Sequence, residues 1–322
     1  MNLYSRQWDE ELLDLFQVEK KKLLTIIQPG SIAGKVSREW SERTGIKQGT
    51  PVVSAGGDQQ CAALGMGVIK TGSIEGSAGI GAFILAASDK IPAGLRDDVI
   101  CNASALPGEY ILESSIPTCA SVFNWLLRLC YGLNEENREL VYRQVNQEIE
   151  QSLLVGDVPF VFPFFQGRGT PDWNSSARGA IQHLSLGTSR GDLARAVLEG
   201  LVCELALNME VLEGYIGCGD SLYLCGGLAN SSVFCRILSG ICQRRVCVYQ
   251  DNEATAIGAF ISAAVAMGLY DGYFQAFCQT REGQQVQEIQ ADQELIEKYS
   301  SKKEQYQELY KALYGVDRGK VR

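Results

Sequence analysis

The chain has 322 residues, of which 46% are hydrophobic and 21% are charged, the balance of an ordinary globular protein. This length suffices for one large domain or two domains of ordinary size. The formal net charge of −9 argues against nucleic acid or an anionic membrane as the main partner. No apolar run in the sequence approaches the ~20 residues that a membrane-spanning helix needs.

The cysteines are numerous but are not spaced like metal ligands. The sequence has 11 cysteines and one histidine, His183, and no two cysteines form a C-x-x-C pair. We therefore expect no zinc site of the usual spacing. The cysteines lie in apolar segments, which is typical of buried, reduced thiols in a cytosolic protein. The acidic, amphipathic N-terminus is unlike a signal peptide, so we predict a cytoplasmic location.

The first 50 residues predict only short elements. Residues 8–24 have the apolar spacing of one or two short amphipathic helices, and Pro29-Gly30 ends that pattern. A further short helix is expected over residues 37–45, followed by a turn that leads into a strand at Pro51. These residues are too few to bury a sizeable core by themselves.

The stretch 51–86 carries the strongest candidate for chemistry. Val52 and its neighbours suit a buried strand, which ends at two glycines that permit a tight turn and close approach of a ligand. Asp58 then stands at the end of a strand, where open α/β sheets bind their ligands, and its carboxylate can accept a proton from a hydroxyl group. The alternative from these residues alone is that Asp58 caps the following helix.

A second glycine cluster, residues 76–81, is predicted to turn between two strands and to present backbone N–H groups to an anion. The alternative is a plain hairpin. Further strands are expected over residues 73–77, 82–86 and 110–114, and helices over residues 120–131, 134–153 and 191–215.

The segment 221–267 predicts strand, glycine turn, helix, strand and helix in that order. A strand at residues 222–225 runs into Gly226-Gly227, and Asn230 or Ser231 caps a helix that ends near residue 243. Such a turn before a helix N-terminus can hold a nucleotide against the backbone. The alternative is an ordinary βαβα segment. Beyond it, residues 287–314 read as one charged helix that packs on the body through Leu295, Tyr299, Tyr306 and Leu309.

The stretch GGDQQCAALGMGVIKTGS, which contains Asp58, resembles the FGGY family of carbohydrate kinases, which includes xylulokinases and glycerol kinases. The resemblance implies that Asp58 is the base that activates the sugar hydroxyl and that Asp58 and Gln59 contact the substrate. Gly79-Ile80-Gly81 matches the family's phosphate-contacting turn, with Ile80 in the place of the usual threonine.

Four more features carry the resemblance. Residues 178–199 match the second FGGY signature except for His183, which stands where glycine is usual. Residues 226–231 resemble the adenosine motif, which implies that Gly226, Gly227 and Asn230 hold the adenosine. Asn124 occupies the place of a nucleotide-contacting glutamine of glycerol kinases; a solvent-facing polar residue is the alternative. Residues 160–180 resemble a xylulokinase-type run that contains the motif G-E-R-T-P, and Arg168 and Gly169 stand at the places of its glutamate and arginine. We favour a structural role for this segment.

The resemblance implies an α/β fold of the actin-like ATPase type, built on a ribonuclease H-like core. Residues 1–66 would be the end of the family's N-terminal domain, residues 67–279 the ATP-binding C-terminal domain, and residues 280–322 a charged helical tail. The implied activity is ATP-dependent phosphorylation of a sugar or polyol with ATP and Mg²⁺, and we favour a ketopentose such as xylulose over glycerol.

One motif of the family is missing. No aspartate in the sequence begins the pattern D-x-G-[ST], the first phosphate motif of the N-terminal domain. We therefore expect the C-terminal part of a kinase: a fragment, a split-gene product or a degenerate member, with the missing domain or a second copy as partner. A non-catalytic nucleotide-binding or interaction protein and an actin-like scaffold remain alternatives.

Overall fold

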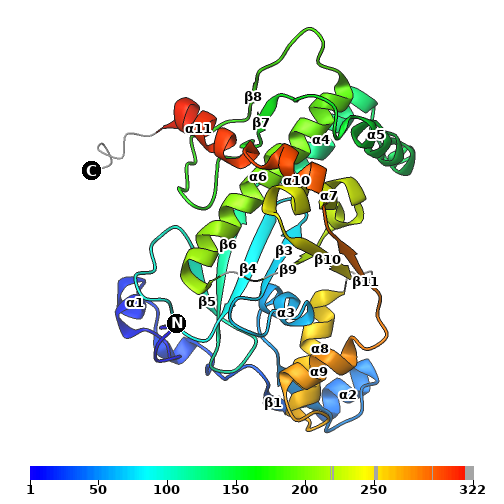
Figure 1. Ribbon diagram of the computed structural model, residues 1–322. Helices are drawn as coiled ribbons and strands as arrows, with labels where there is room; N and C mark the ends of the chain where they lie inside the picture. Colours follow the sequence, from blue (N-terminus) through cyan, green and yellow to red (C-terminus); the bar gives the residue numbers. More distant parts are fainter. Residues whose placement is uncertain (218, 220, 250–252, 292, 316–322) are drawn as a thin grey trace.

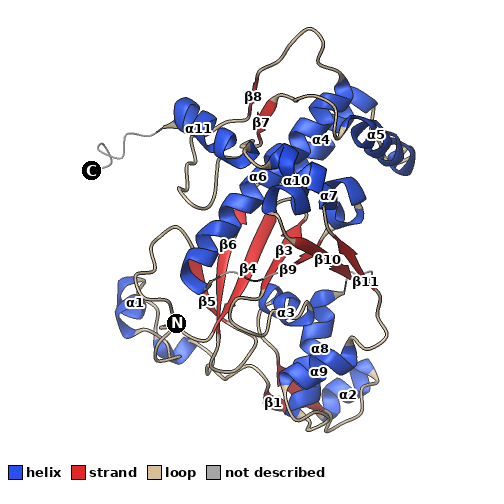
Figure 2. Cartoon of the chain, in the orientation of Figure 1, coloured by secondary structure: helices blue, strands red, loops and turns tan. Residues whose placement is uncertain are grey.

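A seven-stranded mixed sheet forms the centre of the computed structural model, which describes residues 1–217, 219, 221–249, 253–291 and 293–315 (Figures 1 and 2). Strands β3, β9 and β10 are parallel, and the remaining pairs are antiparallel. The strand order across the sheet is β11 (Val286–Ile289), β10 (Arg245–Tyr249), β9 (Ser221–Cys225), β3 (Ile74–Ala78), β4 (Ala82–Ser88), β6 (Tyr110–Ile116) and β5 (Ile100–Ala103).

The main hydrophobic core lies between one face of this sheet and helix α6 (Arg190–Ile216). A capping box between Ser189 and Asp192 begins α6, and the helix then crosses β4 and β6. The same core includes side chains of β7 (Phe160–Phe162), whose partner strand is β8 (Ala180–Gln182), and of five more helices. These helices are α4 (Ala120–Tyr131), α5 (Arg138–Ser152), α7 (Ser232–Cys242), α10 (Gln293–Tyr299) and α11 (Lys302–Tyr314).

The other face of the sheet is covered by α3 (Asp58–Gly65), α8 (Ala254–Ala266) and α9 (Tyr273–Thr280). Figure 1 shows these three helices together at one end of the molecule, with α4, α5 and α11 at the opposite end. The chain is therefore a three-layer α/β structure. No helix within the described ranges has the length and apolar composition that crossing a membrane requires.

The N-terminal residues form short elements, as predicted, but the strand before Asp58 is not buried. Strand β2 (Pro51–Ser54) pairs antiparallel with β1 (Ser31–Lys35), outside the central sheet, and Val52 is 48% exposed. The prediction of a buried strand was wrong because valine also suits the half-exposed surface of a two-stranded ribbon. The other elements here are α1 (Glu10–Leu15), a 3₁₀ turn (Lys20–Lys22) and α2 (Arg38–Thr44).

Most elements predicted in the second half are confirmed within a few residues, and α4 has the predicted bounds. The single charged helix over residues 287–314 was wrong: strand β11 and helices α10 and α11 replace it. Strand β11 is largely polar and lies at the edge of the sheet, where it pairs with β10. Its sequence therefore lacks the alternation of apolar residues that predicts a strand. Leu295, Tyr299 and Tyr306 are buried as expected, and residues 316–322 of the predicted tail lie outside the described residues.

A buried ion-pair network joins the loop after β7 to α6 and α11. Arg168 Nε donates to Glu204 Oε2 at 2.9 Å, and Arg168 Nη1 lies 3.3 Å from Asp172 Oδ1. The Tyr310 hydroxyl donates to Asp172 Oδ2 at 2.5 Å, and the Arg168 guanidinium lies 4.0 Å from the Tyr310 ring centre. These contacts support the structural role that the sequence analysis favours for Arg168.

Replacing Arg168 by leucine should strongly destabilise the fold. The change leaves Glu204 as an unpaired carboxylate that is 1% exposed, and breaking a buried pair in this way costs about 3–5 kcal/mol. Chemical denaturation should show this loss in Arg168→Leu and a much smaller loss in the double variant Arg168→Leu/Glu204→Leu. Equal stability of the single and double variants would contradict a paired role for the two charges.

Candidate functional site

Asp58 is the first residue of α3 and projects from the end of that helix. The N-cap residue is Gly57, not Asp58, so the capping alternative does not describe this side chain. Asp58 Oδ1 accepts a hydrogen bond from the backbone N–H of Gln59 at 2.9 Å. The side chain is otherwise exposed, which leaves the carboxylate open to a ligand.

Close packing of α3 against α8 fixes the position of Asp58. A Cβ atom on Gly258 would lie 1.8 Å from the Cys61 carbonyl oxygen, and one on Gly65 would lie 2.0 Å from that of Ala254. The two backbones therefore touch at positions where no side chain fits. The Thr255 hydroxyl also donates to the Asp58 carbonyl oxygen at 3.5 Å, which joins the first turns of both helices.

The turn after β9 has two glycines with different constraints. Gly226 has φ +92°, and a Cβ there would lie 2.6 Å from the Ala78 carbonyl oxygen, so this residue packs the turn against β3. A Cβ on Gly227 would meet no atom within 4 Å. The Asn230 side chain donates to the Gly227 carbonyl oxygen at 3.4 Å and holds the turn closed.

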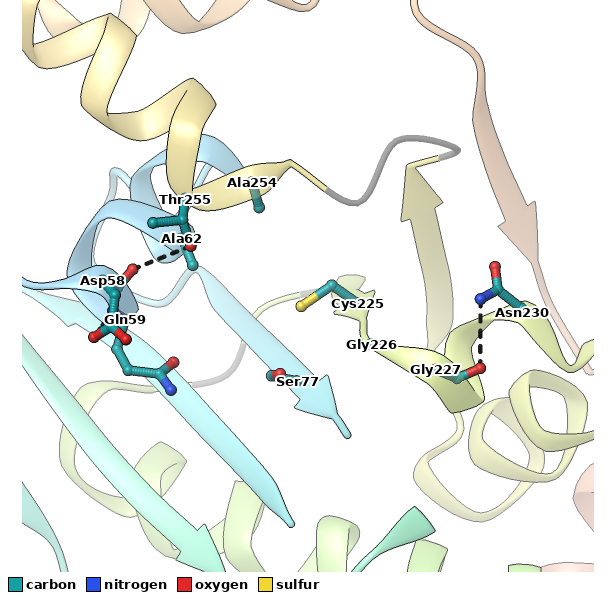
Figure 3. Close-up of a pocket in the computed structure, with 10 residues that line it drawn as sticks. All are labelled: Asp58, Gln59, Ala62, Ser77, Cys225, Gly226, Gly227, Asn230, Ala254 and Thr255. Carbon is teal, nitrogen blue, oxygen red and sulfur yellow. Dashed lines mark hydrogen bonds between the residues drawn. The ribbon is translucent and has the colours of Figure 1, made fainter. Parts of the chain in front are cut away.

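One cavity of about 390 Å³ joins these two places. In Figure 3, Asp58 and Thr255 lie on one side, Gly227 and Asn230 on the other, and Cys225 between them. The cavity therefore brings together the residues predicted for catalysis and those predicted for adenosine. Its lining consists of Asp58, Gln59, Ala62, Ser77, Cys225, Gly226, Gly227, Asn230, Ala254 and Thr255.

The predicted phosphate turn lies between β3 and β4, as expected, but outside the lining of this cavity. The Ile80 carbonyl oxygen accepts the Cys119 N–H at 2.8 Å, and the Gly79 carbonyl oxygen accepts the Ala120 N–H at 2.9 Å. The turn therefore anchors the start of α4, while the Ile80 side chain is 82% exposed. The Gly79 N–H donates to the Gly81 carbonyl oxygen at 2.9 Å, within the turn itself.

Asn124 also lies outside the lining. Its Oδ1 accepts a hydrogen bond from the Tyr142 hydroxyl, which links α4 to α5. The half-buried side chain is thus held by its own domain. The structure places Asp58, Gln59, Gly226, Gly227 and Asn230 around one cavity and leaves Gly79, Ile80, Gly81 and Asn124 beside it.

Sequence reasoning missed several residues at this cavity. Ser77 and Cys225 face it from neighbouring strands, and Thr255 faces it from α8. The period of two along β3 could have placed Ser77 and Glu75 on one face of the sheet. Burial raises the pKa of the Cys225 thiol to about 12, so this cysteine is protonated and unreactive at neutral pH.

Two family models match the chain. The model of the C-terminal domain of the FGGY family of carbohydrate kinases matches residues 76–267, and that of the N-terminal domain matches residues 1–65. The chain belongs to the FGGY family of carbohydrate kinases. The glycerol kinase of Haloferax volcanii is 30% identical over 290 residues, which is 88% of this chain and 54% of that protein. The glycerol kinase of Haloarcula marismortui is 29% identical over 279 residues, which is 84% of this chain and 52% of that protein.

The chain thus spans about half the length of these relatives. Among solved structures, a xylulose kinase from Rhodospirillum rubrum superposes with a TM-score of 0.85 at 22% identity, covering 98% of this chain and 62% of that chain. Plasmodium falciparum glycerol kinase, solved with ADP, superposes with a TM-score of 0.79 at 23% identity. This match covers 100% of this chain and 61% of that chain. These matches confirm the predicted α/β fold of the actin-like ATPase type.

Adding one methyl group at Gly258 should destabilise the chain and displace α3. The new Cβ would overlap the Cys61 carbonyl, and such overpacking costs about 1–3 kcal/mol. The matched control is Gly214→Ala on the exposed end of α6, where a Cβ meets nothing within 4 Å and should add about 0.5–1 kcal/mol of stability. Thermal unfolding of both variants checks this; an unchanged Tm in Gly258→Ala would contradict the tight contact.

Proposed function

We propose that this chain carries the catalytic base and the nucleotide site of an ATP-dependent kinase that phosphorylates a hydroxyl group of a sugar or polyol. The single observation behind this proposal is the shared cavity, which Asp58 and Gly227 line from opposite sides. Phosphoryl transfer depends on holding acceptor and donor in line, and a cavity with a carboxylate at one end and a glycine turn at the other suits that task.

Asp58 is proposed to accept the proton of the attacking hydroxyl, since its carboxylate is exposed to the cavity and, among the described residues, accepts a hydrogen bond from the Gln59 N–H alone. Gln59 is proposed to orient the same substrate. Gly226, Gly227 and Asn230 are proposed to hold the adenosine, because the open space beside Gly227 lets a ligand approach the backbone. Gly79, Ile80, Gly81 and Asn124 are proposed to contact the nucleotide from beside the cavity.

The cavity is suited to a nucleotide and to a magnesium ion that arrives with it. Among the described residues that line the cavity, Asp58 supplies the one carboxylate. Within the described ranges, no group of three or more His, Cys, Asp or Glu residues could hold a metal. Mg²⁺ commonly takes one or two carboxylates together with substrate phosphates and water, so the ion would be held chiefly by the nucleotide, where it offsets phosphate charge.

The acceptor is proposed to be a ketopentose such as xylulose or a polyol such as glycerol. Relatives with about 30% identity are named glycerol kinases, whereas solved structures of the same fold include xylulose and gluconate kinases. We propose residues 1–66 as part of the N-terminal kinase domain, 67–279 as the C-terminal ATP-binding domain, and 280–322 as its helical tail. The family matches at residues 1–65 and 76–267 support the first two ranges.

A second candidate function is nucleotide binding without turnover. It requires only the Gly226-Gly227 turn and Asn230, which line the cavity on the side opposite Asp58. The two candidates differ in one measurement: release of ADP from MgATP in the presence of xylulose, glycerol or gluconate. Sugar-dependent ADP release supports the kinase, and ATP binding without such release supports the second candidate.

Asp58→Asn should lower kcat by at least ~100-fold in any preparation that turns over, because loss of a general base typically costs 10²–10⁴-fold. The amide keeps the size of the side chain and removes its basicity. Asp14→Asn, an exposed position on α1 with the same change of charge, is the matched control and should retain wild-type kcat. A coupled ADP assay compares the three proteins; near-normal kcat in Asp58→Asn would remove this residue from the role.

Gly227→Val should abolish ATP binding and leave the fold intact. The added side chain meets no protein atom within 4 Å at its Cβ, so it would occupy the cavity itself. Gly34→Val on strand β1, which also has open space at its Cβ, is the control and should bind ATP normally. Calorimetry gives the affinities and circular dichroism the fold. Unchanged ATP affinity in a folded Gly227→Val protein would place the nucleotide elsewhere.

A further inference from the structure

A buried carboxyl group lies directly behind the cavity. Glu75 on β3 is 0% exposed, and its register partners are Tyr223 on β9 and Leu85 on β4. Its neighbours in the strand, Ile74 and Gly76, point to the opposite face of the sheet, and Ile74 joins the core beneath α6. The Glu75 side chain therefore lies on the face that α3 and α8 cover, between the sheet and the helices that hold Asp58 and Thr255.

Glu75 is bound on one side only. The Cys225 thiol donates to Glu75 Oε2 at 3.6 Å, whereas Glu75 Oε1 is buried and has no hydrogen-bond partner among the described residues. Cys225 itself lines the cavity and directly precedes the Gly226-Gly227 turn. One contact thus connects a buried acid to the wall of the proposed nucleotide site.

The described hydrogen-bond and register partners of Glu75 are neutral groups. On β9, Tyr223 is its register partner and Cys225 its hydrogen-bond donor. The helix α3, which covers this face, carries Asp58 and Cys61, and α8 adds the uncharged Ala254 and Thr255. On β6, Glu113 lies on the same face beyond Leu85. Arg281, at the end of α9, stacks 4.0 Å from the Tyr249 ring centre and donates to the Gly65 carbonyl oxygen. Burial raises the pKa of Glu75 to about 7, partly offset by the Cys225 hydrogen bond.

We propose that Glu75 is a positioning residue for the phosphate-bearing ligand. The site binds this ligand well when Glu75 is a neutral acid and poorly when Glu75 is a carboxylate. This inference rests on the proposed nucleotide site. The neutral acid holds the Cys225 thiol and leaves the cavity wall uncharged. The carboxylate would place an unpaired negative charge in a low-dielectric region next to a polyphosphate, and like charges repel most strongly there.

The direction of the pH dependence follows from linkage. A bound polyphosphate favours the protonated form of Glu75, so binding is coupled to uptake of a proton. The affinity for MgATP should therefore be highest below pH 7 and should fall as the pH rises through the pKa of Glu75. If binding raises that pKa by one unit, the affinity falls about tenfold across the transition.

The test is calorimetric titration of the full chain with MgATP between pH 6 and pH 8.5, for the wild type and for Glu75→Gln. The amide is neutral at every pH and nearly the same size. Comparing the two proteins at each pH cancels the titration of ATP itself. We expect the ratio of wild-type to variant affinity to fall about tenfold with rising pH, and we expect proton uptake, measured in buffers of different ionisation enthalpy, in the wild type alone.

Two further variants separate this role from a general structural one. Glu113→Gln changes another carboxyl on the same face, whose pKa is also raised by burial and by Asp58, and it should keep the wild-type pH profile. Cys225→Ala removes the hydrogen bond that stabilises the Glu75 carboxylate, so its transition should move to higher pH. This second variant also reports on Glu75 if Glu75→Gln fails to fold.

The outcomes are distinct. Parallel pH profiles of wild type and Glu75→Gln, both binding ATP, overturn the role of Glu75 and leave the proposed function intact. Loss of the pH dependence in Glu113→Gln, or an unmoved transition in Cys225→Ala, also overturns it. Absence of MgATP binding by the wild type at every pH overturns the proposed nucleotide site and this inference together.

Discussion

The contact between α3 and α8 is the constraint on which the candidate site depends. Two helices normally lie 8–10 Å apart because side chains separate them, but here Gly65 and Gly258 let one backbone meet the other. Arg281 adds to this arrangement by donating to the Gly65 carbonyl oxygen at 3.0 Å and 2.7 Å, at the end of α3 where the helix dipole is negative. Asp58 thus begins a helix whose position is fixed by these contacts, while its own side chain is exposed.

The opposite side of the sheet is held in a different way. Helix α6 carries buried charges that are paired within the core, including Arg195 with Glu199 at 3.0 Å and Glu204 with Arg168 at 2.9 Å. Arg195 also donates to the carbonyl oxygens of Val155 and Gly156 in the loop after α5. Such pairs tolerate few alternative arrangements, because a displaced partner would leave a charge unpaired in the core. These pairs therefore join α6 to the loops after α5 and β7 on the face of the sheet opposite α3 and α8.

The sequence predicted the elements that bury an apolar face and missed those that do not. Helix α4 has a clear apolar stripe at Phe123, Leu126 and Leu127, and its bounds were predicted correctly. The edge strand β11, with the sequence VQEI, has no such pattern, and the prediction of a helix there was wrong. Burial of a strand also depends on partners far away in the chain, which is why Val52 could not be recognised as half-exposed.

The site was predictable where family motifs carry it and not elsewhere. Asp58 and Gly227 were found because glycine-rich turns stand out in a sequence, whereas Thr255 comes to the cavity only through the packing of α8 on α3. The sequence does not identify Glu75 as buried, because a single glutamate in a strand is usually exposed to solvent. Its burial follows from α3 folding back over the sheet, which no local pattern reveals.

The turn at Ile80 has a consequence for how this sequence can change over time. Its main-chain oxygen accepts the Cys119 N–H, and its side chain is 82% exposed. The hydrogen bond at this position uses a main-chain oxygen that every amino acid has. The fold therefore places almost no constraint on the identity of the side chain. Isoleucine at this position therefore carries no information about folding, and its replacement should leave the fold unchanged.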